Sequence, residues 1–271
     1  MFMPCFDVER FRRLLRTRVL GQRCHAFEVL DSTNTFAYAL GRQGEPEGAI
    51  VLADEQMAGR GQADRVWISP PRRNLYVSAL LRPLIAPAQA PLLSLLAAVA
   101  LVDTLRQEGA VCGIKWPNDV LIQGRKVAGI LTEMETYQDA VQFVVVGVGV
   151  NINMTEGDLQ YHLGSVARPV TSLQVSLGRE VSREAVLAAL MGCLEAWYDR
   201  FITQGVTDLQ EAWEARSLMH GRRIHARTPD TIWEGTAAGI DRAGRLRLRQ
   251  DDGSLVALTS AEVRFLDHGG P

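Results

Sequence analysis

The segment GRGQADRVW, which ends at Trp67, combines residue types that can hold an anionic ligand. Gly59 and Gly61 allow the backbone to approach a ligand closely, and Arg60 and Arg65 carry forked donors that match phosphate or carboxylate oxygens. The tryptophan adds a surface on which a ring can stack. The same composition is common in solvated loops, so this segment alone leaves both a ligand-binding loop and a flexible basic turn open.

The motif KWPND, residues 115 to 119, is the second unusual segment. A residue before proline is restricted to extended or turn backbone, and the asparagine and aspartate that follow favour a turn. One interpretation is a turn with Trp116 as an anchor in the core. The other adds Lys115 and Asn118 as groups that contact a ligand or bridge a metal.

The segment GRKVAGIL contains the third candidate, Lys126, at the start of a predicted strand. Alternation along a strand places this lysine on one face with Ala128 and Ile130. A lysine in such a position is usually a surface residue. Gly129 lies inside an otherwise apolar strand, which indicates that another group packs against the backbone there.

Several common catalytic motifs are missing from the sequence. The segment GVGVNIN has Ile152 where a dinucleotide-binding fingerprint needs its third glycine, and no helix is predicted to follow. No GxxxxGK[ST] motif, no GxSxG around Ser32 and no HExxH motif occur. These absences argue against a P-loop kinase, a serine hydrolase and a zinc enzyme.

Composition places the chain among ordinary globular proteins. Lysine plus arginine (29) nearly balance aspartate plus glutamate (31), so no global positive field argues for nucleic acid. The four cysteines lie far apart, which favours neither a zinc site nor a disulfide scaffold and fits a reducing cytosol. The N-terminal region carries charges throughout, and the longest apolar run, 91 to 102, is short for a membrane span and predicts a buried helix. We therefore expect a cytoplasmic protein without a membrane partner.

The predicted elements alternate along most of the chain and then change in character. Apolar runs and caps predict helices at 6–20, 32–43, 88–108, 182–203 and 207–216, strands at 27–31, 48–56, 74–83 and 140–153, and a hairpin that turns at Gln123-Gly124. From about Leu218, short alternating strands are separated by Pro-Asp and Asp-Asp-Gly turns. We expect a small β-barrel there, docked on the larger domain because so short a chain buries little core alone.

The order of the motifs is more informative than any one of them. STN, then EQ and GRG with Trp67, then NLY, KWPND, GRK-AGIL and the glycine–asparagine segment together resemble the biotin protein ligases over residues 27 to 155. This resemblance implies an α+β fold: a mixed β-sheet catalytic domain flanked by helices, similar to class II synthetases, at 1–217. It also implies a small C-terminal SH3-like β-barrel at 218–271.

The resemblance further implies a reaction in two steps. Biotin and ATP form biotinyl-5′-adenylate and pyrophosphate, and a lysine of a biotin carboxyl carrier protein then takes the biotin and releases AMP. Because two anions must approach one another, positive groups and Mg²⁺ have to offset their repulsion. A loop that closes over the adenylate would keep it from water.

The resemblance also implies a role for each residue of this sequence that matches a motif of the family. The implied catalytic residues are Lys126, Arg60 and Arg65. The implied biotin-binding residues are Ser32, Thr33, Asn34, Gln56, Arg60, Gly61, Gln62, Lys126, Gly129 and Ile130. The implied ATP-binding residues are Arg65, Trp67, Lys115, Asn118 and Asn151, and no protein metal ligand is implied.

The binding loop departs from the family pattern GRGRxGR at two positions, Gln62 and Asp64. Gln62 lacks the charge of an arginine, so we expect the adenylate to be held less tightly. Asp64 offers a different ordering of the loop, through a pair with Arg65. Only about 25 residues precede the catalytic pattern, which is short for a helix-turn-helix domain, so we expect no DNA binding.

Further alternatives stay open at this point. A homodimer through the catalytic sheet is common in the resembled family. A lipoate ligase or octanoyl transferase shares the fold class, and a non-catalytic biotin-binding homologue would keep the pocket.

Overall fold

The computed structural model describes residues 5–164 and 169–266. The helices are α1 Val8–Leu14, α2 Thr33–Arg42, α3 Pro91–Gln107, α4 Glu156–Leu163, α5 Leu173–Leu177, α6 Arg183–Gln204 and α7 Val206–Glu214, with 3₁₀ turns η1 Gln62–Asp64 and η2 Pro87–Gln89. The strands are β1 Cys24–Leu30, β2 Ile50–Gln56, β3 Leu75–Leu81, β4 Cys112–Lys115, β5 Asp119–Ile122, β6 Arg125–Tyr137, β7 Ala140–Val150, β8 Arg223–Arg227, β9 Ile232–Ile240, β10 Leu246–Arg249, β11 Leu255–Leu258 and β12 Glu262–Phe265.

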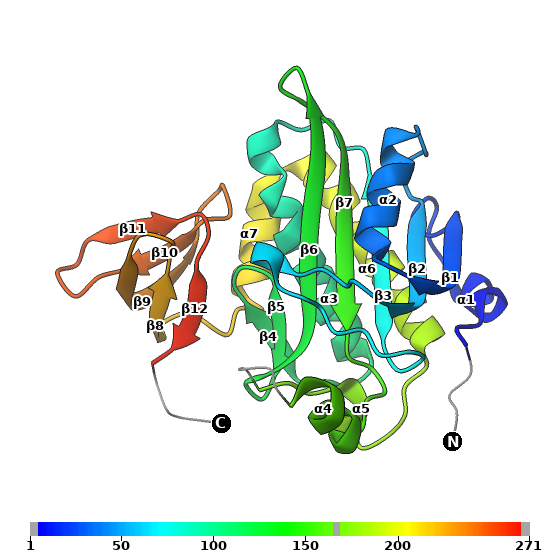
Figure 1. The fold of residues 1–271 in the computed structure, drawn as a ribbon. Helices are drawn as coiled ribbons and strands as arrows, with labels where there is room; N and C mark the ends of the chain where they lie inside the picture. The colour runs from blue at the N-terminus through cyan, green and yellow to red at the C-terminus, as the bar shows by residue number, and fades with distance from the viewer. Residues whose placement is uncertain (1–4, 165–168, 267–271) are drawn as a thin grey trace.

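A seven-stranded mixed sheet forms the centre of the molecule, in the order β1-β2-β3-β7-β6-β5-β4 (Figure 1). Strands β1 and β2 run parallel, and every other neighbouring pair is antiparallel. Alternation along β2 sends Ile50 and Leu52 into the main core and Val51 to the opposite face, under α2. Helices α3, α6 and α7 cover the main-core face, so the expected mixed sheet flanked by helices is confirmed.

Helix α3 is apolar on all sides because it is buried on all sides. Its leucines and alanines are almost completely inaccessible to solvent, and it packs against α6, α7 and four strands. Pro87–Gln107 is long and apolar enough to span a membrane by length and composition alone, yet 72% of that window is buried inside the protein. The segment is a core helix, as the sequence predicted.

The predictions of single turns and helices agree with the structure only in part. The predicted β5–β6 hairpin turn is present, with Gln123 at φ 49° and Gly124 at φ 74°, the positive values that a tight two-residue turn requires. The predicted helix at 6–20 is wrong in its length, because Leu15 turns to extended backbone and α1 stops at Leu14. Helices α4 and α5 were not predicted, since both are short and lack a clear apolar period.

The last five strands form a separate antiparallel sheet in the order β11-β10-β9-β8-β12. It lies beside β4, β5 and α7 (Figure 1), and Trp116 of KWPND donates from its indole N–H to the carbonyl of Gly244 at 3.0 Å. Gly244 also packs closely against Leu92 and Leu95 of α3. The loop between β9 and β10 therefore contacts both helix α3 and the KWPND segment. The expected barrel closure and the boundary at residue 217 stay predictions.

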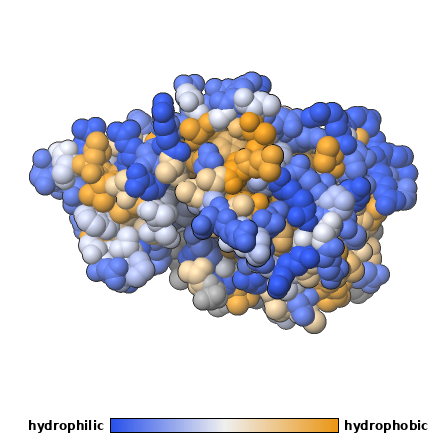
Figure 2. Space-filling view, turned by 90° about the horizontal axis from the view of Figure 1, so that it is seen from above, coloured by the Kyte–Doolittle hydropathy of each residue, from blue (hydrophilic) through white to orange (hydrophobic). Residues whose placement is uncertain are grey.

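Viewed from the end that carries the β6–β7 hairpin, the surface is unevenly apolar (Figure 2). Hydrophilic residues dominate both ends of the molecule in this view, and apolar residues gather between them.

Candidate active site

A cavity of about 350 Å³ lies between the first turn of α2, the loop after β2, and strands β6 and β7. It brings together almost all of the residues that the sequence singled out. The predicted residues that line it are Ser32, Thr33, Asn34, Gln56, Arg60, Gly61, Gln62, Arg65, Trp67, Asn118, Lys126, Gly129, Ile130 and Asn151. Lys115 does not line it.

The end of strand β2 ties the first turn of α2 to the binding loop. Gln56 accepts hydrogen bonds from Thr33, at 2.8 Å from the backbone N–H and 3.1 Å from the hydroxyl. The Gln56 amide nitrogen donates to the Ser69 hydroxyl at 2.9 Å. Ser32 is the N-cap of α2, makes no side-chain cap hydrogen bond there, and lines the cavity. This corner can offer both donors and acceptors to a small polar ring.

Asn34 belongs to the floor of the cavity and is saturated by the protein itself. Its Oδ1 accepts from the Ser78 hydroxyl at 2.6 Å, and its Nδ2 donates to the Leu131 carbonyl and to Glu133 Oε2 at 3.2 and 2.9 Å. A methyl carbon at Gly147 would lie only 1.9 Å from Asn34 Oδ1. The first glycine of GVGV therefore exists to admit this side chain.

Trp67 lies flat against strands β6 and β7 because two glycines leave space for it. A methyl carbon at Gly149 would lie 2.5 Å from Trp67 Cε2, and one at Gly129 would lie 3.0 Å from Cζ3. The prediction that a group packs against Gly129 is thus confirmed. The indole nitrogen of Trp67 is buried with no hydrogen-bond partner among the described residues. A buried, unpaired donor is costly, so it marks a position where a ligand acceptor would be stabilised.

Lys126 is held as a cation at the cavity wall. Its Nζ lies 2.5 Å from Asp119 Oδ1 and 5.2 Å from the centroid of the Trp67 ring. The lysine side chain is 23% exposed and the aspartate 9%, so the ion pair is shielded while one end reaches the cavity. Asp119 was not predicted as a site residue. Its place at the end of KWPND was the available signal, because β5 and β6 pair as a hairpin.

The binding loop folds back on itself as a small hairpin. Backbone bonds run from Gly61 to the Arg65 carbonyl at 2.6 Å and from Trp67 to the Gly59 carbonyl at 2.9 Å. A methyl carbon at Gly59 would lie 2.2 Å from the Trp67 oxygen, which explains the need for glycine. The loop tip is tight, since Ala63 adopts φ 55°. The GRG spacing thus serves the loop's own backbone as well as any ligand.

The two loop arginines differ in what holds them. Arg60 Nη1 lies 2.9 Å from Glu133 Oε1, a partner that sequence reasoning missed. Arg65 donates from Nε to the Gln62 carbonyl of its own loop at 3.0 Å and is exposed. The predicted alternative of an Asp64–Arg65 pair falls on a side chain outside the described ones.

Three predicted ATP-binding residues occupy different surroundings. Asn118 donates to the Ile130 carbonyl at 2.7 Å, and Asn151 donates to the Thr171 carbonyl at 3.1 Å, so both are oriented by backbone. Lys115 is buried under the C-terminal sheet, with Nζ 6.0 Å from the centroid of the Phe265 ring.

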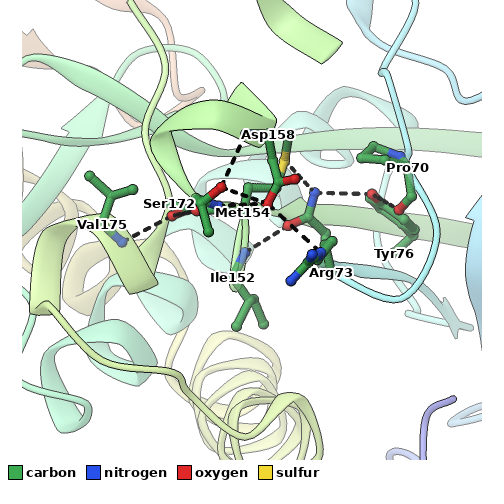
Figure 3. A network of polar contacts seen from close by, with 10 residues as sticks. Pro70, Arg73, Tyr76, Ile152, Met154, Asp158, Ser172 and Val175 are labelled. Carbon is green, nitrogen blue, oxygen red and sulfur yellow. Dashed lines mark hydrogen bonds and ion pairs between the residues drawn. The ribbon is translucent and has the colours of Figure 1, made fainter. Parts of the chain in front are cut away.

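A polar network, shown in Figure 3, includes Tyr76, which also lines the cavity. Asn74 donates to the Tyr76 hydroxyl and accepts from the backbone N–H of Ile152, each at 3.0 Å. The Tyr76 hydroxyl donates to the Pro70 carbonyl at 3.0 Å. Burial raises the pKa of Tyr76 well above its ordinary value, so it stays a neutral donor. The network fixes the chain after the binding loop against the segment after β7, which carries Asn151.

Comparison with known proteins agrees with this geometry. The model of the Biotin/lipoate A/B protein ligase family matches residues 26–151, and that of the Biotin protein ligase C terminal domain matches residues 219–266. The Biotin--[acetyl-CoA-carboxylase] ligase of Paracoccus denitrificans is 40% identical over 241 residues, covering 87% of this chain and 97% of that protein. The chain belongs to the biotin protein ligase family.

Further members of the biotin protein ligase family match over most of the chain. The Bifunctional ligase/repressor BirA of Bacillus subtilis is 39% identical over 252 residues, which is 93% of this chain and 76% of that protein. The biotin protein ligase of Aquifex aeolicus, solved in complex with biotin and ATP, superposes with a TM-score of 0.76 at 23% identity and covers 90% of this chain and 99% of its own. The expected α+β fold of this family is confirmed.

Proposed function

We propose that this chain is a biotin–protein ligase, which activates biotin with ATP and transfers it to a lysine of a biotin carboxyl carrier protein. The observation that carries this function is one cavity that combines an ion-paired lysine, a loop with two arginines and an indole N–H that has no hydrogen-bond partner among the described residues. The Paracoccus denitrificans relative is named for the same reaction, and the Aquifex aeolicus structure holds biotin and ATP.

In the first step a carboxylate oxygen of biotin attacks the α-phosphorus of ATP, which forms biotinyl-5′-adenylate and releases pyrophosphate. Negative charge accumulates where the two anions meet, so a fixed cation there stabilises the transition state. Lys126 is that cation, because Asp119 keeps it in place while its ammonium reaches the cavity. Mg²⁺ enters with ATP, whose phosphate oxygens are the ligands it prefers.

The corner around Gln56 binds the cyclic urea of biotin, since it offers paired donors and acceptors. Arg60 and the Gly61 backbone contact the carboxylate side. Arg65, at the far end of the loop, assists on the phosphate side. The remaining biotin contacts in this proposal are Ser32, Thr33, Gln62, Gly129 and Ile130, with Asn34 as support beneath them.

Trp67 flanks the adenine of ATP, and its indole N–H donates to an acceptor of the bound nucleotide. Asn118 and Asn151 line the same region of the cavity. For Lys115, which lies outside the cavity, a contact with the phosphates requires movement of the KWPND segment. In the second step the acceptor lysine attacks the adenylate carbonyl carbon, and AMP leaves.

The setting of the reaction follows from the proposal. We infer a cytoplasmic setting, because the widely spaced cysteines fit a reducing compartment. A homodimer and the absence of DNA binding are carried forward as proposals. The division at residue 217 is carried forward in the same way.

The decisive experiment measures transfer of labelled biotin to a purified acceptor domain with ATP and Mg²⁺. Wild-type protein is compared with Lys126→Ala and with Lys115→Ala, the only other lysine of the chain. We expect labelled acceptor with the wild type, a loss of about 100-fold or more with Lys126→Ala, and a smaller loss with Lys115→Ala.

The other outcomes are equally clear. Pyrophosphate release without labelled acceptor would support the activation of biotin by ATP, and would show that the chosen acceptor domain is not the partner. Activity on lipoate or octanoyl groups in place of biotin would move the chain to the lipoate branch of the family. Biotin binding without pyrophosphate release would identify a non-catalytic homologue.

A further inference from the structure

Glu133 of strand β6 joins two segments that border the cavity. Its Oε1 lies 2.9 Å from Arg60 Nη1 in the binding loop. Its Oε2 lies 3.1 Å from the same nitrogen and accepts from Asn34 Nδ2 at 2.9 Å. One carboxylate therefore connects the loop after β2 and the first turn of α2 to a central strand. Glu133 itself does not line the cavity, but its partners Arg60 and Asn34 do.

The Arg60 guanidinium can hold Glu133 and a ligand at the same time. Among the described residues, the side chain of Arg60 makes one hydrogen bond, from Nη1 to Glu133, and its ion pair with Glu133 uses the same nitrogen. A guanidinium has five N–H donors in a rigid fork, so Nε and Nη2 stay available for an anion. Glu133 thus orients Arg60 without using up its capacity to bind.

The surroundings make this contact more than an exposed surface pair. The Glu133 side chain is 22% exposed, against 47% for Arg60, and its second oxygen is engaged by an asparagine that is 4% exposed. Asn34 in turn is fixed by Ser78 and by the Leu131 carbonyl. Because buried Asn34 holds its carboxylate, Glu133 is a fixed partner for the more exposed side chain of Arg60.

We propose that Glu133 is a positioning residue, which anchors Arg60, and with it the start of the binding loop, over the cavity. The proposal rests on the proposed biotin ligase function. Loss of the anchor should weaken retention of biotin and of the adenylate, because the loop then samples open positions. The rate of the chemical step, measured as kcat, should change less, because it reports on enzyme that already holds its substrates under a closed loop.

Glu135 supplies a matched control. It lies two residues further along β6 and on the same face, but it pairs with Tyr38 and Arg42 of α2 and not with the loop. Replacing either glutamate by glutamine removes one negative charge from the same strand. Only the change at position 133 touches the link to the binding loop.

The first test is steady-state adenylation by Glu133→Ala, Glu133→Gln and Glu135→Gln. We expect Glu133→Ala to raise the KM for biotin and the dissociation rate of the adenylate about tenfold, with kcat within about threefold of wild type. Glu133→Gln should give a smaller increase, because an amide oxygen still accepts from Arg60. Glu135→Gln should stay within about twofold of wild type.

The second test is a double-mutant cycle with Arg60→Ala. If Glu133 acts through Arg60, adding Glu133→Ala to Arg60→Ala should change the KM for biotin by less than about twofold. An effect as large as in the wild-type background would overturn the proposal, because the carboxylate would then act by another route.

The third test needs no ligand and separates this proposal from the proposed function. Trypsin should cleave after Arg60 and Arg65 faster in Glu133→Ala than in wild type or Glu135→Gln. Unchanged cleavage together with an unchanged KM would overturn the anchoring role. Faster cleavage in a protein whose wild type does not activate biotin would leave the anchor standing and reject the proposed function.

Discussion

Gly149→Ala is expected to displace Trp67 from the site while leaving the strand intact. Gly149 has no positive φ, so alanine meets no backbone strain, and a strand position generally tolerates a side chain. The added methyl carbon would lie 2.5 Å from Trp67 Cε2, whereas carbon atoms in contact are about 3.5 to 4.0 Å apart. The indole must therefore retreat by about 1 Å or more, and the loop that carries it can move more easily than the sheet.

The magnitude follows from what that displacement removes. Stacking of a base on an aromatic side chain is worth about 1–3 kcal/mol, so the KM for ATP should rise roughly 5- to 150-fold. The biotin corner around Gln56 does not touch Gly149, and the KM for biotin should change far less. Crowding in a well-packed interior costs about 1–3 kcal/mol of unfolding free energy, and relief through the loop should keep the cost here at the low end.

The assay is pyrophosphate release with ATP varied at saturating biotin, with unfolding followed in parallel. Gly192→Ala in helix α6 is the control. Apart from the neighbouring backbone of its own helix, no atom lies within 4 Å of the new methyl group, so the variant should keep wild-type kinetics and gain about 0.5–1 kcal/mol of stability. Trp67→Ala should abolish the effect of Gly149→Ala, because the clash then has no partner. A Gly149→Ala protein with wild-type ATP kinetics, or a double mutant much worse than Trp67→Ala, would refute the reasoning.

Three further predictions address the loop, α4 and the thiols. Gln62→Arg should slow dissociation of the adenylate by about tenfold, since it restores a charge-assisted contact worth about 1–3 kcal/mol; an unchanged off-rate in a stopped-flow chase would reject this role for position 62. The hydrogen bond from Arg125 lowers the pKa of Glu156, so its contribution to the docking of α4 is present above the ordinary glutamate pKa of 4.5 and is lost as the pH falls through the lower folded value. The protection of the α4 amides against hydrogen exchange, relative to their intrinsic rates, should therefore fall below about pH 4.5 in wild type, and an Arg125→Gln protein should show no such step. Burial raises the pKa of the Cys112 thiol to about 11, so iodoacetamide at pH 8 should label exposed Cys5 first, and mass spectrometry showing equal labelling would contradict that assignment.

Much of the fold was readable because local signals decide it. Continuous apolar runs predicted the buried strands, and positive φ at Gln123 and Gly124 produced the hairpin that the sequence indicated. Helices α4 and α5 escaped prediction because their positions depend on packing beneath the site, not on their own periodicity. The length of α1 was overestimated because the apolar pattern continues past the point where the backbone becomes extended.

The sequence predicted which residues form the candidate site, but not which of them contact one another. The sequence by itself determined which side chains can bind anions and rings, and where glycine frees the backbone. Only the tertiary structure decided that Glu133 holds Arg60 across 73 residues, that Asp119 holds Lys126, and that Gly149 makes room for Trp67. The physical reason is that residue type and spacing act locally, whereas a contact between distant segments depends on strand register and on which side chains the packed sheet leaves space for.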